Sequence, residues 1–264
     1  MTNTKGMTMP QIDDAELFGN AEDQRAYEDF CANQEAVEKF TLDKPALICR
    51  WRMSNKKVPM LNRHIRALSE RLVQITPAGL TKVFYADNGS SGIEVALKMS
   101  FHYWLNSGQA SKKRFITLSN SYHGETVAAM SVGDVSLFTD TYKPLLLDTL
   151  KVPSPDCYLR PEGMGWEEHS RNMFASMEQT LAEHHETISA VIVEPLIQGA
   201  GGMRMYHPVY LKLLREACDR YDVHLIHDEI AVGFGRTGTM FACEQAGITP
   251  DFLVLSKALT GGYL

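Results

Sequence analysis

Residues 251–264, DFLVLSKALTGGYL, place a short apolar run directly before a lysine. Residues 252–255 are all apolar, as expected of a strand that is buried on both faces, and Lys257 follows close behind. Four other stretches have the same character, and each is expected to form a strand: KVFYAD (82–87), RFITL (114–118), AVIVEP (190–195) and VHLIHDE (223–229).

Segments with a helical period lie between these runs. In SGIEVALKMSFHYWLNSG (91–108) polar residues recur every fourth position, and Gly108 is expected to end the helix. Its predicted buried face consists of Ile93, Ala96, Leu97, Phe101, Trp104 and Leu105. A second helix, PVYLKLLREACDRY (208–221), starts at a proline and is expected to bury Leu211, Leu214, Cys218 and Tyr221. Strands that alternate with helices predict an α/β fold with a mainly parallel sheet covered on both faces.

Composition places the chain among globular proteins. Its 264 residues are 44% hydrophobic and 22% charged, enough for one large domain with or without an appendage. The five cysteines are scattered and never form a CxxC pair, which favours a reduced, cytoplasmic setting. The first twenty residues lack an apolar signal core, and no stretch reaches the ~20 apolar residues that span a bilayer, so we expect a soluble protein.

Charge is distributed unevenly and suggests a boundary near residue 61. Residues 1–40 hold nine acidic residues against three Lys or Arg, whereas residues 44–69 hold seven Lys or Arg and no acid. A nucleic-acid-binding arm is one interpretation of the basic stretch. With Trp51 as its only aromatic residue, we interpret it instead as a solvated linker and expect no nucleic-acid partner. The predicted organisation is therefore an acidic helix and basic linker in residues 1–61, followed by an α/β domain in residues 62–264.

The carboxyl ends of parallel strands are where ligands bind in such folds. Gly89, Ser90 and Ser91 lie between the first of these strands and its helix, where free amides and the helix dipole favour an anion such as phosphate. A glycine turn with a serine N-cap is the alternative. Tyr122 and His123 follow the second strand, and the tyrosine suits either a flat ligand ring or the core.

An acid and a lysine end two further strands. Asp228 closes VHLIHD and Lys257 follows DFLVLS, at a separation that allows one crossover connection. Taken singly, they are consistent with an ion pair. With the two strand ends above, they describe one ligand that has a phosphate, a flat ring, a ring nitrogen to be kept protonated and a carbonyl that condenses with an amine.

Pyridoxal 5'-phosphate has all four of these groups. Lys257 is expected to form the Schiff base as a partly desolvated amine, and Asp228 is expected to pair with the pyridinium nitrogen. Tyr122 is expected to stack on the ring, while Gly89 and Ser90 hold the phosphate.

Five blocks extend this interpretation to a family. They are VFYADNGSSGIEVALKMSFHYW, NSYHGET, VIVEPLIQGAGGMRMY, HDEIAVGFGRTGTMFACEQAGITPD and SKALTGG. From about residue 66 to 264 the chain resembles the class III (fold type I) pyridoxal-phosphate aminotransferases, and QGAGGMRMY indicates the members that serve biotin biosynthesis. The resemblance implies a three-layer large domain, a homodimer and amino transfer from S-adenosylmethionine to 8-amino-7-oxononanoate. It also implies that Lys257 and Asp228 are catalytic, that Lys257 moves the substrate proton, and that His123 joins the cofactor-binding residues.

The chain also departs from the family pattern. Family members continue beyond this lysine, with a cofactor-contacting threonine that reaches across the dimer interface and a C-terminal small domain that carries a carboxylate-binding arginine. Their Trp-rich substrate segment has no clear counterpart in LDKPALICRWRMSNKKVPMLNR (42–63). We therefore expect a large domain that is incomplete at its C-terminus and lacks the small domain. A catalytically inactive fragment or another class III aminotransferase is the alternative.

Two other functions are less consistent with the sequence. GFGRTG (233–238) has the GxGxxG form of a nicotinamide-binding turn, but no strand leads directly into it and no acid follows about 20 residues later. His224 and His227 suggest a metal hydrolase, but residues three apart on a strand face opposite sides. His184 and His185 likewise diverge at a predicted helix end, so no metal site is predicted.

Overall fold

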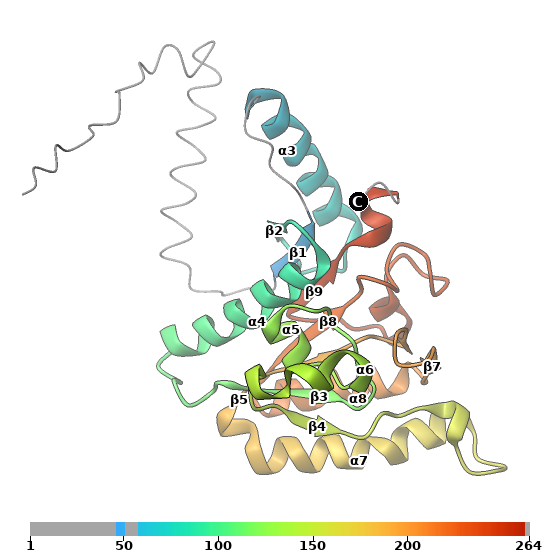
Figure 1. Cartoon of the computed structure of the whole chain (residues 1–264). Helices are drawn as coiled ribbons and strands as arrows, with labels where there is room; N and C mark the ends of the chain where they lie inside the picture. The colour runs from blue at the N-terminus through green and yellow to red at the C-terminus, as the bar shows by residue number, and fades with distance from the viewer. Residues whose placement is uncertain (1–45, 51–57, 262–264) are drawn as a thin grey trace, which may run out of the picture.

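The computed structural model describes residues 46–50 and 58–261, which form one α/β unit (Figure 1). Its main sheet has seven strands in the order β2-β1-β9-β8-β5-β3-β4, and every pairing between them is parallel. The strands are β1 (Ala46–Arg50), β2 (Lys82–Ala86), β3 (Arg114–Leu118), β4 (Leu150–Val152), β5 (Ile188–Val193), β8 (His224–Asp228) and β9 (Phe252–Leu255). The predicted parallel sheet is confirmed, and its five predicted strands correspond to β2, β3, β5, β8 and β9.

Helices connect the strands, and a small antiparallel hairpin lies apart from the sheet. The α-helices are α3 (Val58–Ile75), α4 (Gly89–Asn106), α5 (Val127–Ser131), α6 (Ser136–Thr139), α7 (Trp166–His184) and α8 (Val209–Arg220). The 3-10 helices are η1 (Asp140–Leu145), η2 (Cys157–Leu159), η3 (His185–Thr187), η4 (Ala242–Ala246) and η5 (Lys257–Thr260), and the hairpin pairs β6 (Ile197–Gln198) with β7 (Arg204–Met205). Among the described residues, no helix combines the length and apolar character needed to cross a membrane.

Alternate residues of the central strands pack on opposite faces of the sheet. On β8, Ile226 belongs to the core shared with α4 and α5, whereas Leu225 belongs to the core shared with α7 and α8. On β9, Leu253 and Leu255 pack with Leu72 of α3 in a third cluster. Both faces are thus covered, which explains why the strands are apolar throughout and confirms the predicted three layers.

The buried stripe of helix α4 is narrower than the sequence predicts. Ile93, Leu97 and Trp104 are almost fully buried, but Phe101 and Leu105 are 38% and 46% exposed. At about 100° per residue these two lie on the flank of the stripe that faces the sheet, because a helix against a sheet covers only about a third of its circumference. The predicted burial of Phe101 and Leu105 is therefore wrong.

The basic stretch at residues 44–69 is not only a linker. Within it, β1 pairs with β2 on one side and β9 on the other, and α3 begins at Val58. The solvated-linker interpretation fails there because the short run Ala46–Arg50 pairs in the sheet between β2 and β9. The acidic helix predicted for residues 1–40 lies outside the described residues, and the domain boundary at residue 61 stays a prediction.

Candidate active site

A cavity of about 560 Å³ opens at the carboxyl ends of the parallel strands. We call it the strand-end cavity. It brings together all six residues predicted as cofactor-binding, namely Gly89, Ser90, Tyr122, His123, Asp228 and Lys257. Asn88, Gly124 and Glu194 also line it and were not predicted.

One wall of the cavity is the N-terminus of α4. Asn88 caps this helix, since its side-chain oxygen accepts a hydrogen bond from the Ser91 amide at 2.8 Å, so the predicted alternative of a serine cap is wrong. Asn88 rather than serine fills this position because the helix begins at Gly89, two residues before the predicted stretch at 91–108. The first amides of a helix have no partner within it, and those of Gly89 and Ser90 lie beside the cavity. This arrangement suits an anionic group.

Gly124 holds the opposite loop against Ser90. Ser90 Oγ lies 2.8 Å from Thr126 Oγ1 and accepts a hydrogen bond from the Thr126 amide at 3.0 Å. Gly124 has φ +120°, and a Cβ there would lie 2.4 Å from Ser90 Oγ and 3.0 Å from Ser90 Cα. Only glycine permits this approach.

We predict that Gly124→Ala weakens the binding of pyridoxal phosphate by at least about tenfold, equal to about 1.4 kcal/mol, because the added methyl displaces Ser90. Titration of the cofactor into the purified protein, followed by absorbance, measures the affinity. Gly235→Ala is the matched control, since Gly235 also has positive φ but no atom lies within 4 Å of an added Cβ. Equal losses in the two variants would attribute the effect to backbone strain alone and contradict this account.

Asp228 is held in place by two hydrogen bonds. Its Oδ1 accepts from the Ile230 amide at 3.1 Å, and its Oδ2 lies 2.7 Å from His123 Nδ1. Asp228 and His123 are both buried. With the proton on Nδ1 the imidazole donates to the carboxylate, so His123 orients the carboxylate that faces the cavity.

Glu194 is a second buried acid in this cavity. It follows β5, and its carboxylate accepts hydrogen bonds from the amides of Tyr122 at 2.9 Å and Gly199 at 3.0 Å. Burial, opposed by His123 and reinforced by Asp228, raises the pKa of Glu194 to about 7. The rule on strand ends could have identified Glu194, because it lies near the end of the predicted strand at residues 190–195.

This raised pKa predicts a pH-dependent stability. A carboxyl that is easier to protonate in the folded state stabilises the fold below its unfolded pKa near 4.5, and that stabilisation is lost as pH rises through about 7. Because Glu194→Gln cannot ionise, its free energy of unfolding should gain roughly 3 kcal/mol relative to the parent between pH 4.5 and 8.

Urea unfolding of the cofactor-free protein at several pH values measures this difference. Glu168→Gln, which removes an exposed carboxylate on α7, is the control and should show no such gain. Glu194→Gln also loses an acceptor for one amide, which lowers its free energy of unfolding by the same amount at every pH. The test is therefore how the difference in unfolding free energy between variant and parent changes with pH. A difference that does not change with pH would contradict the raised pKa of Glu194.

Tyr122 and Lys257 complete the cavity. The Tyr122 ring packs 4.9 Å from Phe138, centroid to centroid, and its hydroxyl donates to Glu125. Burial, with that hydrogen bond, raises the pKa of Tyr122. Lys257 begins η5 with φ +41° and is exposed, so the predicted partial desolvation of its amine is not found. The chain leaves the sheet at Leu255, which turns Lys257 out of the core.

Asp228 and Lys257 come from adjacent strands, as predicted. Strands β8 and β9 pair in parallel, with Asp228 opposite Val254. Both residues line the strand-end cavity, and no ion pair joins them within the described part of the chain.

The other sequence patterns have different surroundings. GFGRTG lies in turns after β8, and no helix follows it directly. His224 packs against Trp104, with ring centroids 4.6 Å apart, whereas His227 belongs to the opposite face of β8. The predicted divergence of these two histidines is confirmed. His184 ends α7 and His185 opens η3, as expected of a helix end.

The fold and the cavity define a three-layer α/β protein with a ligand site at the carboxyl edge of a parallel sheet. The family model for class-III aminotransferases matches residues 50–264. The chain therefore belongs to the class III aminotransferase family.

Several curated relatives share one name, adenosylmethionine-8-amino-7-oxononanoate aminotransferase. The Geobacter sulfurreducens protein is 45% identical over 206 residues, which are 78% of this chain and 46% of the relative. The Aquifex aeolicus protein is 50% identical over 198 residues, 75% of this chain and 44% of the relative. The chain thus spans about half the length of the curated relatives it matches.

Solved structures agree on the fold. An ω-transaminase from Pseudomonas jessenii in complex with PMP matches with a TM-score of 0.70 at 36% identity. The match covers 75% of this chain and 44% of the ω-transaminase chain. A thermostable 4-fold mutant of the Pseudomonas jessenii ω-transaminase reaches 0.72 at 34% identity, covering 81% and 47%. The family and these neighbours imply pyridoxal phosphate as the cofactor.

Proposed function

We propose that the protein transfers an amino group from S-adenosylmethionine to 8-amino-7-oxononanoate with pyridoxal 5'-phosphate as cofactor. One observation carries the proposal: Asp228 and Lys257, at the ends of paired strands, line one cavity with the N-terminus of α4. The choice of substrates rests on relatives that carry this name at 45–50% identity.

The residues of the cavity fit the cofactor. Its volume of about 560 Å³ suits a ligand of this size, and Gly124 permits the close approach of its loop to Ser90. Gly89 and Ser90 would hold the phosphate with their amides, and Tyr122 would cover the ring. When bound, the cofactor supplies a carbonyl that condenses with amines and a ring that accepts the electron pair left on the substrate Cα.

Asp228 and His123 act as a pair. The Ile230 amide and the His123 ring each contact one carboxylate oxygen of Asp228 and fix its orientation, so Asp228 would pair with the ring nitrogen of the cofactor and keep it protonated. His123 is a positioning residue in this scheme, since it acts through Asp228.

Lys257 supplies the reactive amine. Its amine would condense with the cofactor carbonyl, and the same amine would move the proton at the substrate Cα. The exposed position of Lys257 at the mouth of the cavity leaves the amine accessible to both partners.

Growth of a biotin-requiring strain that lacks this aminotransferase tests the whole proposal. Expression of the protein should restore growth without biotin, and a Lys257→Ala variant at equal expression should not. The Pseudomonas neighbours, which are ω-transaminases and an amine transaminase, favour a second candidate, amino transfer from other amines. Failure to grow, together with amino transfer from a simple amine in a direct assay, would favour that candidate.

We also propose a homodimer in the cytoplasm. Several apolar side chains of α6 and η1 are exposed around a second pocket, with Leu137 at 83% and Leu145 at 63%, and such a patch is typical of a subunit interface. The buried free thiols of Cys157, Cys218 and Cys243 support a reducing compartment. Light scattering should give twice the 29.6 kDa mass of one chain, and a mass of one chain would contradict the dimer.

A further inference from the structure

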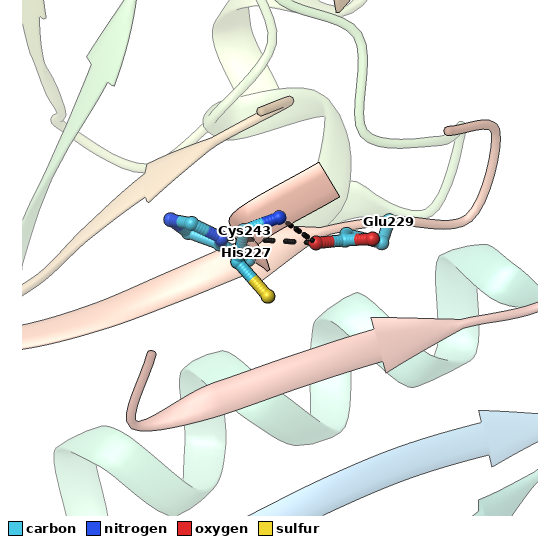
Figure 2. A group of neighbouring side chains, drawn as sticks. All are labelled: His227, Glu229 and Cys243. Carbon is cyan, nitrogen blue, oxygen red and sulfur yellow. Dashed lines mark hydrogen bonds and ion pairs between the residues drawn. The ribbon is translucent and has the colours of Figure 1, made fainter. Parts of the chain in front are cut away.

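Three potential metal ligands lie on the face of β8 that is turned away from the strand-end cavity. The side chains of His227, Glu229 and Cys243 are buried, and their ligand atoms all lie within 4.8 Å of one another. Figure 2 shows His227 and Glu229 at the end of β8 and Cys243 beside them in η4. Residues two apart in an extended segment project to the same face, so Asp228, which lies between the two ligands, projects to the other.

The ring of His227 has no adequate partner. Neither nitrogen makes a hydrogen bond among the described residues, although the ring is fully buried. Nδ1 points toward Glu229, but its 4.0 Å distance from Oε1 is too long for a hydrogen bond. Buried nitrogens are rarely left unpaired in folded proteins, and the unprotonated nitrogen of a neutral ring can be satisfied by a cation.

Glu229 is oriented as a metal-binding carboxylate would be. Its Oε2 accepts from the Ala242 amide at 2.7 Å and its Oε1 from the Cys243 amide at 2.9 Å. Such outer hydrogen bonds commonly fix ligands around a metal. The ion pairs of the described residues join Glu229 to no lysine or arginine, so a bound cation would be the positive partner of its carboxylate.

We propose that His227, Glu229 and Cys243 bind one divalent cation of borderline softness, with Zn²⁺ as the best match. Imidazole, carboxylate and thiolate are all zinc ligands, whereas Mg²⁺ and Ca²⁺ prefer oxygen alone. The thiol proton of Cys243 leaves on binding, and thiolate and carboxylate together balance the charge of the ion. A water completes a tetrahedral site.

Such an ion would form a structural link behind the strand-end cavity. The ion joins the end of β8 to η4 and fixes the segment that carries Asp228 between two ligands. Because the three side chains are buried, the ion enters as the chain folds and exchanges slowly.

The test uses the full chain, expressed without a histidine tag in minimal medium supplemented with Zn²⁺ or Co²⁺. Elemental analysis after gel filtration should find about one equivalent per chain, and the Co²⁺ protein should show a thiolate charge-transfer band. Cys243→Ser should lose the band and retain below about 0.1 equivalent. Cys218→Ser, which alters another fully buried thiol on α8, should retain both.

A second variant guards against misfolding. His227→Leu removes one ligand and both unpaired nitrogens, and it should fold without metal. Zn²⁺ in the medium should raise the melting temperature of the parent protein but not that of this variant. Parent protein that retains below about 0.1 equivalent overturns the proposal, as does metal content in Cys243→Ser or His227→Leu equal to that of the parent.

Discussion

Replacing Lys257 with Ala is expected to lower the rate of amino transfer by about 10⁴-fold or more, which corresponds to about 5.5 kcal/mol in the barrier. The alanine removes both the amine proposed to condense with the cofactor and the group proposed to move the substrate proton. Lys257 is the only lysine that lines the strand-end cavity, so no other amine of the described chain takes its place there. Single-turnover measurements with S-adenosylmethionine as donor provide the rate.

Two variants separate chemistry from charge. Lys257→Arg keeps a cation at the mouth of the cavity but offers no amine for condensation, and it should be as slow as the alanine variant. Lys212→Ala removes an exposed lysine on α8 and should leave the rate unchanged. If Lys257→Arg keeps more than about a tenth of the parental rate, Lys257 acts only as a charge.

Replacing Asp228 with Ala is expected to lower the same rate by about 10³-fold, or about 4 kcal/mol, while the cofactor still binds through Lys257. Without this carboxylate the ring nitrogen would lose its proposed counter-charge, and the ring would accept electron density poorly. The variant also leaves His123 without its acceptor, so far-UV circular dichroism should first confirm the fold.

Asp251→Asn is the matched control for the loss of a partly buried carboxylate. Asp251 precedes β9, where it pairs with Arg215 at 2.8 Å and accepts from the Leu225 amide at 2.7 Å. It does not line the strand-end cavity, so its replacement should reduce stability without slowing the reaction. An Asp228→Ala variant that transaminates at the parental rate would remove the proposed role.

The central strands could be predicted because both faces of each are buried, which makes runs such as FLVL (252–255) continuously apolar. The run Ala46–Arg50 was missed because a charged neighbourhood surrounds four apolar residues, and only its pairing with β2 and β9 makes it a strand. Local sequence therefore identifies strands that alternate clearly with helices, but not one that is added between them.

The candidate site shows a similar limit. Gly89, Asp228 and Lys257 could be predicted, since each lies at the end of an apolar strand. The contact between Ser90 and Thr126, and the support that Gly124 gives it, depend on a loop packed against a distant helix. Likewise, Cys243 lies near His227 only in the folded chain, so the pattern HLIHDE alone does not predict their proximity.

The identity of the lysine that carries the cofactor tests the central claim most directly. The purified chain is incubated with pyridoxal phosphate, reduced with borohydride to convert a carbon–nitrogen double bond into a stable amine, and digested for peptide mass analysis. We predict that the added mass lies on Lys257, and that Gly124→Ala lowers its yield. Stoichiometric modification of a different lysine, or of none, would contradict the assignment of the strand-end cavity as the cofactor site.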